Sequence, residues 1–172
     1  MTFSDILKGK WLKHPLHPLL THLPVALWPA AFLFDLLSHL KTVGNTMVQL
    51  SFFSMVLALA SAALAVPTGL ADWSAVKKSN PAWRLGLYHM LLNLIVFLLF
   101  LVNVALRIGS FRTDTEVSGV PLLLSAVGTA FLFWSAHLGS QMIYDSGVGI
   151  ARYSKKKLRR AAAAGGANLP EE

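Results

Sequence analysis

Four long apolar runs, separated by short polar segments, constrain the fold of this chain more than any other feature. They cover about residues 19–40, 47–70, 85–106 and 120–143. Each run has the ~20 residues that an α-helix needs to cross the hydrocarbon core of a bilayer. With 55% hydrophobic and 13% charged residues, the 172-residue chain also has too little polar surface for a water-soluble domain of its size. The sequence therefore predicts an all-α, four-helix transmembrane bundle that runs up-down-up-down, with both termini on the same side.

Basic residues are distributed unevenly between the segments that join the runs. Twelve of the 15 Lys and Arg residues fall on one side, and Lys41, Arg107 and Arg112 fall on the other. The positive-inside rule places the richer side, with both termini and the middle loop, in the cytoplasm. The chain has no cysteine, which excludes disulfides, thiolate metal sites and thiol catalysis.

Three regions are expected along the chain. Residues 1–18 form a basic interfacial lead-in, in which the prolines at 15 and 18 favour an extended or turned segment over 14–18. Residues 19–150 form the membrane domain, where Pro24 falls in the first turn of a helix. Residues 151–172 form a basic and then low-complexity tail, expected to be disordered. No recognition pattern accompanies the basic run, so nucleic-acid binding is not expected.

Polar residues recur at matching ends of the four runs. His22 and His89 lie at the starts of the first and third runs, while Asp72 and His137 lie near the ends of the second and fourth. Successive helices point in opposite directions, so these side chains should lie at one membrane depth. Imidazoles in hydrocarbon are costly and indicate a functional site.

Helical spacing extends this set of residues. A stripe on the third run comprises His89, Asn93, Val96, Phe100 and Asn103, and a stripe on the fourth comprises His137, Gln141 and Tyr144. Both stripes are expected to face the bundle interior, because lipid offers such groups no hydrogen-bond partners. Asp35 is expected to belong to a separate contact at the outer end, with His39 one turn further on.

Three kinds of chemistry fit three imidazoles with a carboxylate. Two facing imidazoles can hold the iron of a b-type haem. His22, His89 and His137, with His17 as a further ligand, suit a transition metal ion such as zinc, copper or ferrous iron. Without a metal, His–Asp pairs can pass protons. A structural reading stands beside these: the same groups can serve only to hydrogen-bond one helix to another.

Several short motifs resemble those of a known family. They are the segment from His14 to Pro24 (HPLHPLLTHLP), Thr68-Gly69-Leu70-Ala71-Asp72, His89 at the head of the third run, and Ala136-His137-Leu138-Gly139-Ser140 with the following Tyr144-Asp145-Ser146-Gly147-Val148-Gly149. In this order they resemble the domain of unknown function 2231 (DUF2231) family of bacterial inner-membrane proteins, over about residues 14–150. Ser140 stands where members often have a second glycine. Some members are joined to Rieske or cytochrome-like domains, so the resemblance implies membrane redox work by association.

These observations give a leading hypothesis and an alternative. The leading hypothesis is a multi-pass inner-membrane protein with a histidine-lined site near the cytoplasmic side, which binds haem b or a metal ion through His22, His89 and His137, with Asp72 and Asn93 nearby. Its partners would be the lipid bilayer and redox proteins or further copies of the chain, and no catalysis of its own is expected. The alternative is a non-catalytic membrane subunit whose histidines stabilise helix packing.

Overall fold

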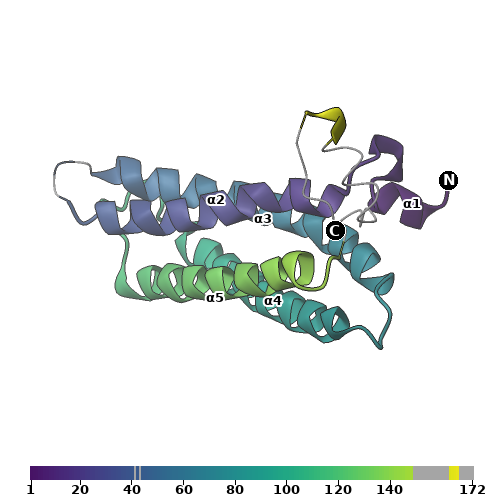
Figure 1. Ribbon diagram of the computed structural model, residues 1–172. Coiled ribbons are helices and arrows are strands. Elements are labelled where there is room, and N and C mark those ends of the chain that lie inside the picture. Colours follow the sequence, from purple (N-terminus) through teal and green to yellow (C-terminus); the bar gives the residue numbers. More distant parts are fainter. Residues whose placement is uncertain (41, 43, 149–162, 167–172) are drawn as a thin grey trace.

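The chain is a bundle of four long helices preceded by a short helical segment (Figure 1). The computed structural model describes residues 1–40, 42, 44–148 and 163–166. Its elements are α1 (Phe3–Leu7), the 3₁₀ helix η1 (Lys10–Leu12), α2 (Leu16–Leu37), α3 (Asn45–Ser74), α4 (Pro81–Arg107) and α5 (Gly119–Tyr144). Helices α2 to α5 are each long and apolar enough to cross a membrane, and the described residues contain no strand. The predicted all-α, four-helix fold is confirmed.

The four helices form two hairpins that lie one on the other. Helix α2 packs most extensively against α3, and α4 against α5; fewer contacts join α2 to α5 and α3 to α4. Figure 1 shows the first hairpin above the second, with α1 at the end where α2 begins. The segment 108–118 lies at the opposite end, where the side chain of Asn45, at the start of α3, donates to the carbonyls of Phe111 and Asp114.

Helix α2 begins earlier than the sequence indicates. The sequence favours an extended or turned segment over 14–18, but α2 begins at Leu16 and contains His17 and Pro18. A proline is tolerated there because the first amides of a helix have no partner within it. Pro24 consequently lies well inside the helix, where it cannot donate to the carbonyl of Leu20. The hydroxyl of Ser61 on α3 donates to that carbonyl instead, at 2.8 Å.

The centre of the bundle is apolar and closely packed. The rings of Trp28 and Phe100 stack with their centroids 4.8 Å apart, in one buried cluster with Met55 and Leu132. Gly128 lets α5 approach this pair, since a Cβ at that position would lie 2.7 Å from the Phe100 ring. The core thus separates a polar layer at one end of the bundle from a second polar layer at the other.

The N-terminal segment precedes the bundle as a short capped helix. Asp5 accepts from the amide of Thr2 and pairs with Lys10, and these contacts lower the pKa of Asp5 to about 2. Phe3 and Trp11 in this segment are exposed. The predicted tail at 151–172 lies outside the described residues except for 163–166.

Candidate functional site

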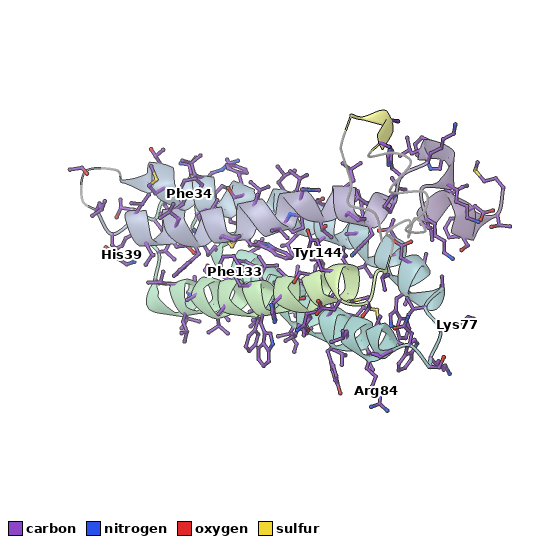
Figure 2. The ribbon with its side chains drawn as sticks, viewed as in Figure 1. Phe34, His39, Lys77, Arg84, Phe133 and Tyr144 are labelled. Carbon is purple, nitrogen blue, oxygen red and sulfur yellow. The ribbon has the colours of Figure 1, made fainter. Side chains whose placement is uncertain are left out.

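Five of the six histidines lie toward the end of the bundle where α2 and α4 begin and α3 and α5 end. His39 lies at the opposite end from Lys77 of the middle loop (Figure 2). The common depth expected from the sequence is therefore present, but the structure gives these histidines very different surroundings.

His17 binds across the first hairpin. Its Nδ1 lies 3.0 Å from the carbonyl oxygen of Ala65 and 3.4 Å from the hydroxyl of Thr68, both on α3. Its ring covers Gly69, where a Cβ would lie 2.6 Å from the Cε1 atom of His17. A carbonyl oxygen only accepts, so Nδ1 carries the proton and the lone pair of the ring is on Nε2.

His89 makes the same arrangement in the second hairpin. Its Nδ1 lies 2.8 Å from the carbonyl oxygen of Ser135 on α5, and its ring covers Gly139. Here the other nitrogen is also occupied: the Asn93 amide lies 3.1 Å from Nε2 and also donates to the hydroxyl of Ser135 at 2.7 Å. The predicted pairing of His89 with Asn93 on one interior stripe agrees with this network.

His22 and His137 do not join these two residues. Both are exposed, and the Nδ1 of His22 contacts the carbonyl of Leu19 in its own helix. The stripe of His137, Gln141 and Tyr144 was expected inside the bundle; however, Tyr144 is 80% exposed, and the buried face of α5 is instead Pro121, Ser125, Gly128, Thr129, Leu132 and Ser135. Among the described residues, no three His, Asp or Glu side chains are grouped so that they could hold a metal ion.

Asp72 lies near the histidine of the first hairpin rather than at the centre of a cluster. It is half-buried near the end of α3, and its carboxylate interacts electrostatically with His17 and with Lys8. The polar layer at this end is therefore built around His17 and His89, with Asp72 at its edge.

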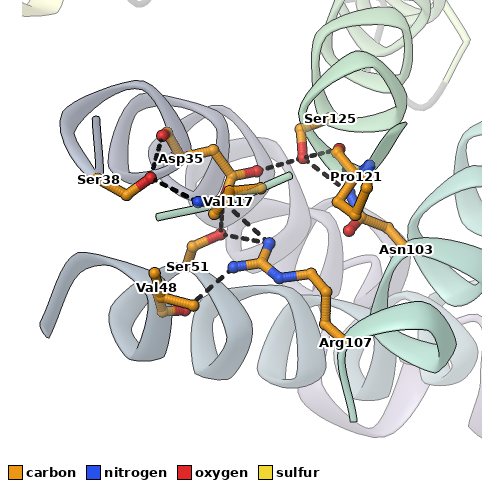
Figure 3. A network of polar contacts seen from close by, with 9 residues as sticks. All are labelled: Asp35, Ser38, Val48, Ser51, Asn103, Arg107, Val117, Pro121 and Ser125. Carbon is orange, nitrogen blue, oxygen red and sulfur yellow. Dashed lines mark hydrogen bonds and ion pairs between the residues drawn. The ribbon is translucent and has the colours of Figure 1, made fainter. Parts of the chain in front are cut away.

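A second polar layer occupies the other half of the bundle and includes a buried ion pair. Figure 3 shows Nη1 of Arg107 on α4 donating to Oδ1 of Asp35 on α2, at 2.9 Å. Ser51 on α3 and Ser125 on α5 each donate to the Asp35 carboxylate, and Nη2 of Arg107 donates to the carbonyl of Val48. All four helices therefore contribute to one hydrogen-bonded network around a charge pair that is almost fully buried.

This network corrects two expectations. Asp35 contacts Arg107 and not His39, whose ring lies 3.7 Å from Glu116. Arg107 was counted as a loop cation but is a buried residue that ends α4. The signal was available, because position 107 continues the interior stripe of His89, Asn93, Val96, Phe100 and Asn103 by one further turn.

The fold and the polar layers define a multi-pass membrane protein of four apolar helices. The family model of DUF2231, described as a predicted membrane protein, matches residues 13–152. The chain therefore belongs to the DUF2231 family, as its motifs indicated. Neither a curated protein nor a solved structure matches the chain.

Proposed function

We propose that this protein is a non-catalytic membrane subunit in which His17 and His89 fix the two helix hairpins at the cytoplasmic end of the bundle. The observation that carries this proposal is the repeated contact of each imidazole with a carbonyl of the partner helix, above a glycine. In lipid, such bonds hold helices together where the hydrophobic effect between helices is absent. The excess of basic residues at this end supports a cytoplasmic location for both termini in a bacterial inner membrane.

A second function is favoured by the tautomer of the two imidazole rings. In both histidines Nδ1 binds a carbonyl, which leaves the lone pair on Nε2, as in histidines that ligate metals. Haem b or a transition metal ion would then be held between His17 and His89 rather than by His22 and His137. Binding at His89 would require Asn93 to move, because its amide already lies at Nε2. In this case the protein would serve redox partners in the membrane.

Purified full-length protein, incubated with haemin and separately with zinc, copper and ferrous iron, distinguishes the two functions. The subunit proposal predicts no haem absorbance band and no stoichiometric metal. It also predicts that His89→Ala lowers the free energy of unfolding by about 1–2 kcal/mol, because the Ser135 carbonyl and the Asn93 amide each lose a hydrogen bond to the imidazole. His22→Ala is the matched control and should change stability little, since His22 is exposed.

The opposite result identifies a cofactor site. If the unaltered protein binds haem or a metal and His89→Ala folds normally but loses it, the subunit proposal is wrong. His17 and His89 would then be assigned as the ligands if His17→Ala loses the same cofactor and His22→Ala retains it.

A further inference from the structure

The two hairpins are built on the same pattern. His17 and His89, Trp28 and Phe100, and Asp35 and Arg107 are each 72 residues apart on α2 and α4. On α3 and α5 an offset of 70 residues relates Ala58 to Gly128, Ala65 to Ser135 and Gly69 to Gly139. Four of these six pairs are buried in both hairpins, and the histidine and glycine pairs are half-buried in both, where the histidine–glycine contacts repeat.

Contacts between the hairpins follow the same relation. The two hairpins are joined mainly by the contact of α2 with α5 and the contact of α3 with α4. If the two hairpins exchange places, each of these helix pairs is converted into the other. Equivalent residues of α2 and α4 meet each other: Trp28 stacks on Phe100, and Asp35 pairs with Arg107. The bundle thus has an approximate two-fold axis parallel to its helices, and it resembles a dimer of hairpins joined in one chain.

Such a chain has a choice of partners. The inward faces of the hairpins present equivalent buried positions, so the alternative partner of a hairpin is the same hairpin of a second copy. Pairing of two first hairpins would place Asp35 against Asp35 in the apolar interior, and pairing of two second hairpins would place Arg107 against Arg107. Like charges at such a depth repel strongly and lack the counter-charge that makes their burial tolerable.

We propose that the Asp35–Arg107 ion pair selects the partner of each hairpin. It joins α2–α3 to α4–α5 and excludes pairing of a hairpin with its own copy from another chain. The selection rests on complementary charge at equivalent positions. Ser51 and Ser125 complete the hydrogen bonding of Asp35.

The contact between Ser38 and Val117 provides a reporter of which hairpins have paired. The hydroxyl of Ser38, at the end of α2, accepts from the amide of Val117, just before α5, at 3.0 Å. Because the chain has no cysteine, Ser38→Cys and Val117→Cys in one chain are expected to form an intrachain disulfide on oxidation. When the two substitutions are in separate, differently tagged copies, a disulfide between copies forms only if their hairpins have been exchanged.

The test co-expresses two full-length copies with altered charges. One carries Asp35→Arg with Ser38→Cys, and the other carries Arg107→Asp with Val117→Cys. The first copy then has arginine at both positions 35 and 107, and the second copy has aspartate at both. Opposite charges can therefore face each other only when a hairpin of one copy pairs with a hairpin of the other. We therefore expect an inter-copy disulfide in this mixture at several-fold the level seen for copies with the native charges, or for a pair in which both copies carry Asp35→Arg.

Two outcomes would overturn the proposal. One is an equal inter-copy disulfide in all mixtures, which would mean that partner choice ignores charge. The other concerns a single chain with Asp35→Arg, Arg107→Asp, Ser38→Cys and Val117→Cys, which is expected to form its intrachain disulfide as the native-charge chain does. If it does not, the hydrogen bonds made at each position, and not complementary charge, decide the pairing.

Discussion

At the scale of single residues, two glycines decide how closely each histidine approaches its partner helix. A Cβ at position 69 would lie 2.6 Å from the His17 ring, and one at position 139 would lie 3.1 Å from the His89 ring. The first distance requires the ring to move, whereas the second requires a shift of only a few tenths of an ångström. The two sites are alike in chemistry, but position 139 tolerates an added Cβ better than position 69 does.

We accordingly expect Gly69→Ala to destabilise the protein by about 1–3 kcal/mol, as overpacking of a core does. Gly139→Ala should cost less, because its nearest contact is longer. Gly119→Ala is the control, since a Cβ at that position meets nothing within 4 Å. The measurement is the free energy of unfolding in detergent micelles. Equal effects of all three substitutions would show that the histidine–glycine contacts are loose in solution.

At the scale of a helix, sequence periodicity predicts the depth of a residue along the bundle better than the direction in which its side chain faces. The spacing of His137, Gln141 and Tyr144 forms a stripe, but spacing alone does not say which side of α5 faces its neighbours. The true interior face is rich in small residues such as Ser125, Gly128 and Ser135, which give a weaker sequence signal than an imidazole does. On α4 the polar stripe and the packing face coincide, so His89 and Asn93 lie toward α5, on the interior side that their spacing predicts.

Helix α2 also shows how one element compensates for a break in another. Pro24 leaves the carbonyl of Leu20 without its usual amide, and Ser61 on α3 donates to it. We expect Ser61→Ala to destabilise the protein by about 1 kcal/mol, in the range measured for hydrogen bonds between membrane helices.

Pro24→Ala tests this explanation directly, because it restores an amide that can donate to Leu20. In the Pro24→Ala background, Ser61→Ala should cost measurably less, and the coupling is obtained from a double-mutant cycle. Additive effects of the two substitutions would mean that Ser61 stabilises the helix pair by another contact.

At the scale of the whole molecule, the number of helices, their order and their approximate ends could be predicted from the sequence, because spanning a bilayer fixes the length and composition of a helix. The pairing of the helices could not. It depends on side chains that meet across the axis, such as Asp35 with Arg107, and these positions are 72 residues apart. The repeat that relates them is visible only when burial is known, since few of its equivalent residues are identical.

The same ion pair bears on the orientation of the bundle in the membrane. Because Arg107 is buried against Asp35, it does not act as a loop cation, and the poorer side retains only Lys41 and Arg112 against 12 basic residues on the richer side. We therefore expect a reporter that is active only outside the cytoplasm to be inactive when fused after Glu172 and active when inserted at Thr113. The variant Lys77→Gln/Lys78→Gln/Arg84→Gln should keep this orientation, since the basic residues near both termini remain. The reverse pattern of reporter activity would place the histidine layer at the outer face and contradict the cytoplasmic location proposed for both termini.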